Sequence, residues 1–454
     1  MIVGLMAKAQ NPNPDSQIDS DIQAEMQTFN LPGVSTAIVK GGKIVWMKSY
    51  GYANTLTQKP YADTTSQMLA SVSKVFAGVT LMQLHEDGAF NLGDSINKFL
   101  PFPIRVPNYE STPITFKMLL THTASIQDSQ AGDDYYNWNG DPTISLADVC
   151  QRFFSTSGQD YSATENFVNS APGSTFKYTN MGTALEGYLV ELIAQKPFHT
   201  YCNENIFNLL CMNRTRWNFS EFSDTTTVAN PHDNAGAVYT PKAHYGFADF
   251  PSGGLKSNVT DLANFMVTLL NGGSLNGSSI LNSATIDSML KSAVPSVDAT
   301  MGLQFYTSTF TINGAQKSLW GHGGEEAGIQ TEMYFDKSSD MGVVALANSR
   351  NSVKNIFEIL FEYGLTLSSA SGRDLTCGAV TSVDETDETV GKTFPNPTHN
   401  FVQIQNFTED IWQLHDITGK IISSGTTATV DLSNVKSGLY FLQINGEKHA
   451  VIKN

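Results

Sequence analysis

The sequence predicts an α+β fold, in which one antiparallel sheet flanked by terminal helices carries a helical insert, followed by a small C-terminal β-sandwich. Strand-like apolar runs lie near both ends of the first 367 residues, whereas residues 90–300 mix short helical patterns with Gly, Asn, Ser and Pro loops. Strands separated by a long helical section can share one sheet, which leaves a cleft between the sheet and the insert.

The predicted sheet begins with a hairpin over residues 33–52, where Gly41-Gly42 makes the turn between two apolar runs. Later strand patterns cover residues 303–311, 330–335 and 341–346. A helix that places Val353, Ile356, Phe357 and Leu360 on one face closes this part of the chain. The sheet is therefore expected to combine strands from both ends of the first domain.

Composition and charge describe an acidic globular protein. Apolar residues make up 41% and charged residues 15% of the 454 residues, and 43 acidic against 27 basic residues give a net charge of −16. No basic patch or arginine-rich run is available to neutralise phosphates, which argues against nucleic-acid binding. No run of 18 apolar residues is present, so no transmembrane segment is expected.

Four segments follow from the composition along the chain. Residues 1–19 are expected to be a signal-peptide remnant or a disordered N-terminus, because their apolar stretch ends in the cleavage-like sequence Ala7-Lys8-Ala9. Residues 20–367 form the first domain. Ser, Thr, Asp and Glu dominate residues 368–392, as in an exposed linker, and short alternating strands resume in residues 393–454.

The four cysteines, Cys150, Cys202, Cys211 and Cys377, match no zinc-binding spacing. An exported protein permits disulfides, for which Cys202 and Cys211 are the nearest pair, and buried free thiols are equally compatible with the sequence. Neither a metal nor a cofactor is expected.

A candidate nucleophile lies in the S-V-S-K segment at residues 71–74, where a helical apolar pattern starts. Residues three apart share one face of a helix, so the Lys74 amine stands beside the Ser71 hydroxyl and can assist removal of its proton. The S-x-x-K spacing occurs at four other places in the chain, so only its context can select this copy.

Two further elements carry suitable chemistry. Tyr178-Thr179-Asn180 follows a Pro-Gly turn and precedes an apolar helix pattern, so its phenol and amide lie on a loop that enters a helix. A phenol beside a lysine ammonium is a candidate base. His322 lies among glycines in residues 321–324, just before a predicted strand, where backbone can approach a ligand closely and offer N–H groups as an oxyanion hole does.

These elements, in this order, resemble the serine β-lactamase and penicillin-binding-protein superfamily, and most of all its class C-like branch of esterases, D-stereospecific peptidases and β-lactamases. That branch carries S-x-x-K, then Y-x-N, then K-T-G or H-x-G on a strand. Residues 119–123 (L-L-T-H-T) and 252–255 (S-G-G-L) also agree with it. The resemblance covers residues 20–366 and implies the β-lactamase/transpeptidase-like fold.

The resemblance implies a role for each matching residue. Ser71 is the nucleophile of an acyl-enzyme reaction, Lys74 its proton-relaying partner and Tyr178 the base, and whether Lys74 or Tyr178 takes the first proton stays open. Asn180 is expected to hydrogen-bond the acyl side chain of the substrate. His322 is expected to support Tyr178, and if it must be neutral the rate falls as the pH drops through the ordinary histidine range, near about 6.5.

The glycine-rich segment completes the expected site. The backbone N–H groups of Ser71 and Glu325 are expected to form the oxyanion hole, since Glu325 follows Gly323 and Gly324 directly. His122, in the L-L-T-H-T segment, is expected to be a packing residue and not a catalyst.

At one position the sequence departs from the family. The Lys and Thr of K-T-G ordinarily hold a substrate carboxylate, and His322 and Gly323 stand in their place. An esterase or a D-amino-acid-type peptidase or amidase therefore ranks above a class C-like β-lactamase or D,D-carboxypeptidase. Two non-enzymatic functions stay open below these: a catalytically silent binding protein on the same scaffold, and a surface adhesin that acts through residues 394–454.

Residues 393–454 resemble the C-terminal sorting domain of type IX-secreted proteins from Bacteroidetes-type bacteria. The matching features are Pro395-Asn396-Pro397, D-x-x-G-K at residues 416–420, D-L-S at 431–433 and G-x-Y at 438–440. The resemblance implies that the type IX secretion machinery is a partner, and that the protein is exported through the periplasm to become secreted or surface-bound.

Overall fold

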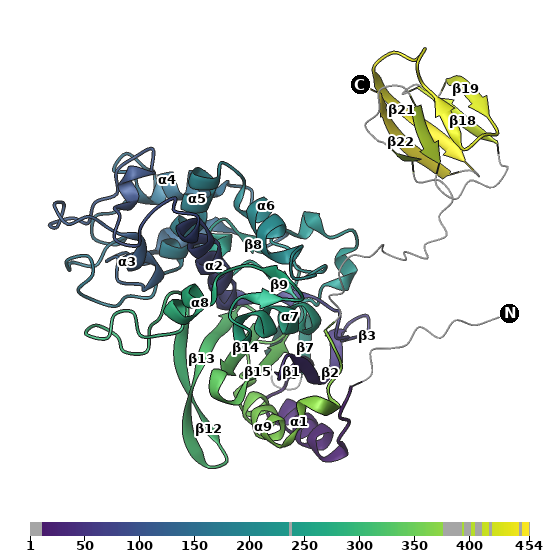
Figure 1. Ribbon diagram of the computed structural model, residues 1–454. Coiled ribbons are helices and arrows are strands. Elements are labelled where there is room, and N and C mark those ends of the chain that lie inside the picture. The colour runs from purple at the N-terminus through teal and green to yellow at the C-terminus, as the bar shows by residue number, and fades with distance from the viewer. Residues whose placement is uncertain are drawn as a thin grey trace. The chain divides into compact units, whose positions relative to one another are not determined.

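The computed structural model describes residues 11–235, 238–375, 393–394, 401–404, 411–416, 420–444 and 447–453. The chain divides into two compact units, residues 1–378 and 379–454, which Figure 1 draws with the helices and strands labelled. The predicted signal remnant up to residue 10 and the linker from residue 376 to 392 lie outside the described residues.

The helices of the first unit are α1 (Ser16–Thr28), α2 (Ser73–Glu86), α3 (Phe116–Leu120), α4 (Leu146–Phe154), α5 (Asn180–Ala194), α6 (Phe198–Cys202), α7 (Val259–Leu270), α8 (Ser283–Met289) and α9 (Lys354–Thr366). Its long strands are β1 (Gly33–Lys40), β2 (Lys43–Asn54), β12 (Tyr306–Ile312), β13 (Ala315–Glu326), β14 (Ile329–Asp336) and β15 (Met341–Ala347). Its short strands are β3 (Lys59–Pro60), β4 (Gln67–Met68), β5 (Tyr136–Asn137), β6 (His232–Ala235), β7 (Val238–Pro241), β8 (Gly246–Phe247), β9 (Lys256–Ser257), β10 (Ser274–Leu275) and β11 (Ser278–Ser279).

The central sheet has seven antiparallel strands in the order β12-β13-β14-β15-β1-β2-β3. Val34 of β1 pairs with Ala347 of β15, so strands from both ends of the unit meet in the middle of the sheet, as predicted. The predicted β1–β2 hairpin is also confirmed. Gly41 and Gly42 make its turn with φ of 57° and 73°, a conformation that glycine adopts without a Cβ clash.

The sheet buries both of its faces, because alternate residues of a strand point to opposite sides. Ala37 and Val39 of β1 belong to the core that includes α7, whereas Ile38 belongs to the core that includes α1 and α9. In Figure 1, α1 and α9 lie side by side against the sheet, and the helical region with α3, α4, α5 and α6 lies at its other end. The predicted helical insert is therefore present, and α2 connects it to the sheet.

The ordered fold extends beyond both predicted limits of the first domain. Helix α1 starts at Ser16, inside the segment predicted to be disordered, because Asp15 caps its first turn by accepting the backbone N–H groups of Gln17 and Ile18. At the other end, the backbone of Arg373 exchanges two hydrogen bonds of 3.0 Å with Ile44 of β2, so residues beyond 367 still pack on the sheet.

The second unit consists of two antiparallel sheets. One contains β16 (Thr393–Phe394), β17 (Phe401–Ile404) and β20 (Thr429–Asp431), and the other contains β18 (Trp412–His415), β19 (Ile421–Gly425), β21 (Gly438–Ile444) and β22 (Glu447–Lys453). Val402 and Val430 of the first sheet share one hydrophobic core with Trp412, Leu414 and Leu442 of the second. The unit is therefore the small β-sandwich that the sequence predicts.

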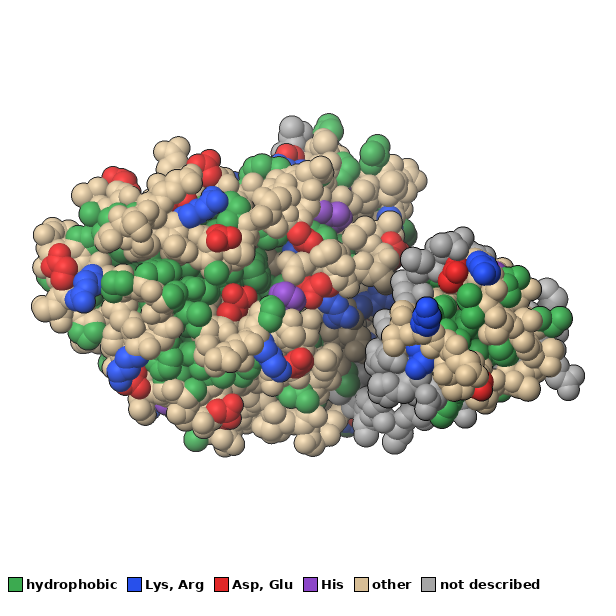
Figure 2. Space-filling view, turned by 90° about the horizontal axis from the view of Figure 1, so that it is seen from above, with side chains coloured by type: hydrophobic (Ala, Val, Ile, Leu, Met, Phe, Trp, Pro, Cys, Tyr) green, Lys and Arg blue, Asp and Glu red, His purple; other side chains and the backbone are tan. Residues whose placement is uncertain are grey.

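Three further findings concern the cysteines and the surface. Cys150 and Cys202 are buried free thiols, so the Cys202–Cys211 pair does not form. Among the described residues, no helix has both the length and the hydrophobicity to span a membrane. Charged side chains of both signs are distributed over the face seen in Figure 2.

Candidate active site

Ser71 lies in a tight turn at the start of a buried helix. A 3₁₀ turn at Ala70–Val72 leads directly into α2, and Ala70 adopts a positive φ of 50°, which is rare for a residue with a side chain. The Ser73 hydroxyl accepts the Leu255 backbone N–H at 3.1 Å and ties this turn to the S-G-G-L segment. The strained turn leaves Ser71 partly exposed at the floor of a cavity, while Lys74 one turn later is buried.

Lys74 is in contact with Ser71, as the spacing predicts. Its Nζ atom lies 3.2 Å from Ser71 Oγ, 2.8 Å from Asn180 Oδ1 and 2.6 Å from the backbone oxygen of Ser252. Three acceptors therefore surround a side chain that has no solvent exposure. The Ser252 carbonyl was not predicted, because a backbone acceptor leaves no signal in residue type.

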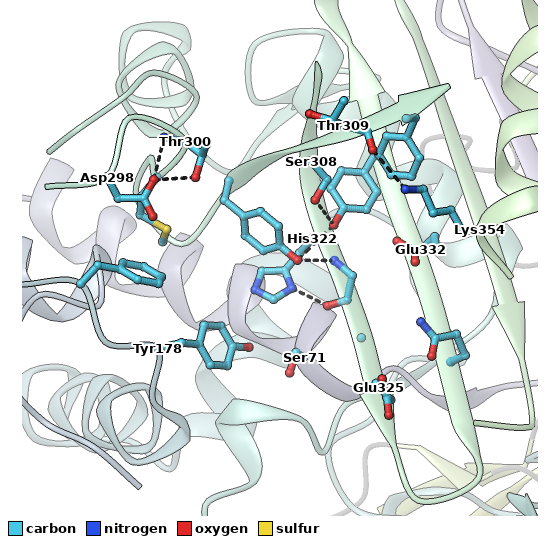
Figure 3. A pocket seen from close by; sticks show the side chains of 18 residues that line it. Ser71, Tyr178, Asp298, Thr300, Ser308, Thr309, His322, Glu325, Glu332 and Lys354 are labelled. Atoms are coloured by element: carbon cyan, nitrogen blue, oxygen red, sulfur yellow. Dashed lines mark hydrogen bonds between the residues drawn. The ribbon is translucent and has the colours of Figure 1, made fainter. Parts of the chain in front are cut away.

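Tyr178 and Asn180 stand at the N-terminus of α5, as predicted. Asp128 holds this terminus by accepting hydrogen bonds from the Thr179 hydroxyl (2.7 Å) and from the backbone N–H groups of Asn180 and Met181 (2.9 Å each). The Tyr178 ring lies 4.9 Å from Lys74 Nζ. In Figure 3 its hydroxyl points toward Ser71. Asp128 thus positions two predicted site residues without touching Ser71 itself.

The glycine-rich segment precedes the predicted strand, which is β14, and is itself part of strand β13. Strand β12 pairs with β13 only as far as the Tyr306–Gly321 pair, so residues 322–326 form a free edge beside the cavity. A Cβ atom at Gly324 would lie 2.3 Å from the Leu69 backbone oxygen and 3.1 Å from the Ser71 nitrogen. Only glycine allows this close approach, which brings the β13 backbone against the turn that carries Ser71.

His322 is buried between Tyr178 and Tyr306, with ring centroids 6.2 Å and 4.6 Å away. Its Nδ1 atom lies 2.5 Å from the Gly323 carbonyl oxygen, and its Nε2 atom has no hydrogen-bond partner among the described residues. Burial, reinforced by the positive charge of Lys74, lowers the pKa of His322 to about 3. With such a pKa the imidazole is neutral well below pH 6.5, so His322 gives no reason to expect a fall in rate near that pH.

His122 packs against Tyr178, with ring centroids 4.6 Å apart. Burial, with a smaller effect from Lys74, holds its pKa well below the usual range, so its imidazole is also neutral. The Gln304 side chain lies near this ring, but neither ring nitrogen makes a hydrogen bond of normal geometry to any residue that the structure describes. His122 thus forms one wall of the site.

These residues surround a cavity of about 570 Å³ (Figure 3). Of the predicted residues, Ser71, Tyr178, His322, Gly323, Gly324 and Glu325 line it. Lys74 and Asn180 lie beneath Ser71 and are connected to it through the hydrogen bonds of Lys74. The remaining lining residues are Phe176, Asp298, Thr300, Met301, Tyr306, Ser308, Thr309, Phe310, Gln330, Glu332, Tyr334 and Lys354.

Two buried carboxyl groups lie behind Lys74, and sequence analysis missed both. Glu186 accepts a hydrogen bond of 2.6 Å from Gln304, and burial raises its pKa to about 8. Asp249 accepts one of 3.0 Å from the Ser252 hydroxyl, and burial raises its pKa to about 6. Neither belongs to a metal site, since no group of three or more His, Cys, Asp or Glu side chains in the described part of the chain is arranged to hold a metal ion.

Comparison with known proteins identifies both units. Residues 18–359 match the Beta-lactamase family, and residues 392–454 match the Secretion system C-terminal sorting domain. Protein flp of Staphylococcus aureus (strain COL) is 24% identical over 335 residues, which are 73% of this chain and 62% of that protein. The chain thus spans about three fifths of the length of this curated relative.

Two solved structures show the same fold at low sequence identity. EstCE1, a hydrolase with promiscuous acyltransferase activity, has a TM-score of 0.58 and 18% identity, over 77% of this chain and 97% of its own. A class C beta lactamase from Rhodobacter sphaeroides has a TM-score of 0.58 and 17% identity, over 77% and 98%.

The sorting-domain match indicates a type IX signal and therefore secretion or export to the cell surface. The match of residues 18–359 covers more than half of the chain, and the seven-stranded sheet and the Ser71–Lys74 pair agree with it. This chain belongs to the beta-lactamase family of serine hydrolase folds and carries a C-terminal sorting domain.

Proposed function

We propose that the protein is a secreted serine hydrolase that cleaves an ester or amide through an acyl-enzyme on Ser71. The observation that carries the proposal is the 3.2 Å contact between Lys74 Nζ and Ser71 Oγ, made by a lysine that is fully buried. Holding a lysine without solvent is costly unless its hydrogen bonds are satisfied, and here the serine hydroxyl is one of its three acceptors. A purely structural lysine has no need of this geometry.

In the proposed reaction, Ser71 Oγ attacks the substrate carbonyl carbon and its proton passes to Lys74 or Tyr178. The leaving alcohol or amine takes that proton, and the acyl group stays bonded to Ser71. Water then attacks the acyl-enzyme with Tyr178 as base, which releases the acid and restores the serine. The N–H groups of Ser71 and Glu325 are proposed to hold the oxyanion.

His322 supports the ranking of an esterase or D-amino-acid-type peptidase or amidase above a class C-like β-lactamase or D,D-carboxypeptidase. A neutral imidazole at this position offers no permanent positive charge to a substrate carboxylate. Gly323 adds no hydroxyl. The cavity therefore lacks, at these two positions, the groups that a carboxylate-bearing β-lactam or peptide requires.

A substrate panel tests this proposal. Wild type and Ser71→Ala are compared on p-nitrophenyl esters of increasing chain length, D-alanine p-nitroanilide and nitrocefin, and both are treated with a fluorophosphonate probe. We expect ester or anilide hydrolysis and covalent labelling by the wild type alone. Efficient nitrocefin hydrolysis that disappears in Ser71→Ala would instead establish a β-lactamase. A folded wild type that neither labels nor hydrolyses any compound would indicate a binding protein.

For the second unit we propose recognition by the type IX secretion machinery. The support is the sorting-domain match together with a sandwich that has its own hydrophobic core. A chain ending at Gly378 is expected to keep its hydrolase activity and to remain unsecreted in a type IX-competent host. Loss of activity on truncation would argue that this unit binds substrate, and loss of cell attachment at unchanged secretion would support an adhesin.

A further inference from the structure

The cavity continues past Ser71 along the free edge of β13 to a second group of polar side chains. Glu332 and Tyr334 of β14, together with Tyr306 and Ser308 of β12, form this group, which we call the Glu332 subsite. In Figure 3, Glu332 and Ser308 lie on the far side of His322 from Tyr178. One cavity of about 570 Å³ is lined both by the nucleophile and by the Glu332 subsite.

Gly323 opens this part of the cavity. A Cβ atom at this position would lie 3.1 Å from Glu332 Oε2, 3.2 Å from the Tyr334 hydroxyl and 3.6 Å from the Tyr306 hydroxyl. A side chain at this position would therefore crowd the Glu332 and Tyr334 oxygens and contact the Tyr306 oxygen. Because residue 323 is glycine, those oxygens face open space beside the β13 edge.

The hydroxyl groups of the subsite are bonded to one another. Tyr334 donates to Tyr306 at 3.1 Å and shares a 3.1 Å hydrogen bond with Ser308, and Tyr306 accepts the Gly323 backbone N–H at 3.2 Å. These contacts fix the hydroxyls around the Glu332 carboxylate. Among the described residues, no Lys, Arg or His nitrogen lies within 4.0 Å of that carboxylate.

The other charged groups of the cavity are already engaged. Glu325 forms a 2.6 Å ion pair with Arg350, and Asp298 accepts hydrogen bonds from the backbone and hydroxyl of Thr300. Lys354 donates to the Thr309 carbonyl at 3.2 Å, and its Nζ lies 5.3 Å from the Phe310 ring centre.

Asp298 and Lys354 also lack an ion-pair partner among the described residues, but hydrogen bonds to Thr300 and Thr309 hold them, whereas Glu332 has only the Gln330 side chain beside it. Burial raises the pKa of this carboxyl to about 7, although the more distant positive charge of Lys354 and the side chain of Gln330 favour its ionised form.

We propose that the Glu332 subsite binds a protonated primary amine on one arm of the substrate, so that the enzyme prefers ammonium-bearing esters or amides. An ammonium group has three protons to donate, and a carboxylate with surrounding hydroxyl oxygens supplies acceptors for them. The net charge of −16 attracts such substrates as well. This inference rests on the proposed hydrolase function and specifies its substrate class.

Matched substrates test the amine preference. For the acyl arm these are the p-nitrophenyl esters of 6-aminohexanoate, hexanoate and adipate, and for the leaving-group arm the acetate esters of tyramine, 4-ethylphenol and 3-(4-hydroxyphenyl)propionate. In one of the two series, the one whose charged group reaches the Glu332 subsite, we expect kcat/KM for the cationic ester to exceed that for the neutral ester by about tenfold. This factor corresponds to the free energy of one charge-assisted hydrogen bond.

Two variants locate the preference. Glu332→Gln, which keeps the shape and removes the charge, is expected to reduce the cationic-to-neutral ratio to about one. The control is Glu358→Gln, on α9 and outside the cavity, where Glu358 accepts the Thr311 backbone N–H; it makes the same change in net charge and should keep the ratio. Gly323→Ala is expected to lower the ratio because its Cβ presses on Glu332. Equal rates for cationic and neutral esters on both arms, or a preference for the anionic ester, would overturn the proposal.

A binding measurement separates this proposal from the hydrolase function. Calorimetry on Ser71→Ala, which cannot form an acyl-enzyme, is expected to detect n-hexylammonium and to show about tenfold weaker binding once Glu332→Gln is added. Sodium hexanoate should not bind. Ammonium binding without ester hydrolysis would contradict the hydrolase function alone, whereas hydrolysis without ammonium binding would contradict the subsite alone.

Discussion

The two ends of the cavity differ in how their polar groups are satisfied. At the Lys74 end, the lysine meets three acceptors, and Asp128 caps the helix that carries Asn180. At the β13 end, Glu332 has no ion-pair partner among the described residues, and the Nε2 atom of His322 is likewise without a hydrogen bond there. A lysine with three acceptors is held in one position and suits the reaction steps, whereas a carboxylate without an ion pair is available to a ligand. The proposed chemistry and the proposed amine specificity therefore occupy separate ends of one cavity.

The largest effect on kcat/KM is expected from a substitution of Lys74. Lys74→Met keeps the bulk and removes the amine, so kcat/KM on the best p-nitrophenyl ester should fall by about 1,000-fold, within the range that a positioned proton-transfer group contributes. Steady-state kinetics check this, and circular dichroism checks the fold.

Lys256→Met is the matched control, because Lys256 is also buried, donates to the Trp217 carbonyl at 2.7 Å and lies outside the cavity. It is expected to lose stability and keep activity. An equal loss of activity in both variants would assign the effect to losing any buried lysine.

A smaller effect is expected from Asp128→Asn. The amide has only one acceptor oxygen, so it cannot keep all three hydrogen bonds to residues 179–181, and we expect kcat/KM to fall about 10- to 100-fold through misplacement of Tyr178 and Asn180. Asp141→Asn controls for capping itself, since Asp141 accepts the backbone N–H groups of Phe219 and Ser220 away from the cavity. Unchanged kinetics in Asp128→Asn would remove the positioning role.

Glu186, which lies behind Lys74, is expected to make the free energy of unfolding depend on pH. Burial raises the pKa of Glu186 from 4.5 to about 8, so between these values the folded protein keeps a proton that the unfolded chain releases. The free energy of unfolding should therefore decrease as the pH rises through this window. Glu186→Gln should remove that dependence and stabilise the protein at pH 8 by about 1–3 kcal/mol, the cost of an unsatisfied buried polar group. Urea unfolding at pH 5 and 8 tests this, with exposed Glu165→Gln as the control; a parallel decrease in wild type and Glu186→Gln would contradict it.

The smallest effect concerns the β13 end. Because the pKa of His322 is about 3, its imidazole stays neutral from pH 5 to 8 and should add no inflection to the rate of neutral ester hydrolysis in that range. The pH profiles of wild type and His322→Gln should therefore have the same shape. An inflection near 6.5 that is present only in the wild type would show that this histidine titrates at its ordinary value.

Local patterns predicted the elements whose spacing is itself the signal. Two apolar runs joined by Gly41-Gly42 indicated the hairpin, and the three-residue spacing of Ser71 and Lys74 indicated their contact. Asp128 could not be predicted in this way, because the residues it caps lie about 52 positions further along the chain. The neutral state of His322 could not be predicted either, because burial lowers the pKa of its imidazole and a sequence motif does not show whether a residue is buried.

Glu332 illustrates the same limit at the other end of the cavity. Its strand was predicted as residues 330–335, but nothing in that pattern indicates that Gly323 on the neighbouring strand leaves its carboxylate uncovered. The subsite arises because β13 and β14 pair with Gly323 opposite Glu332, which the sequence of either strand alone does not indicate.

The pairing of β1 with β15 also sets the order in which the protein can mature. The middle of the sheet cannot form until Val34 of β1 pairs with Ala347 of β15. The turn that carries Ser71 likewise needs Gly324 of β13 to pack against it. Contacts between such distant residues make folding slow and late. A nascent chain that ends before β13 therefore contains the serine and its lysine but no assembled pocket, so the proposed hydrolytic activity requires nearly the whole first unit to be synthesised.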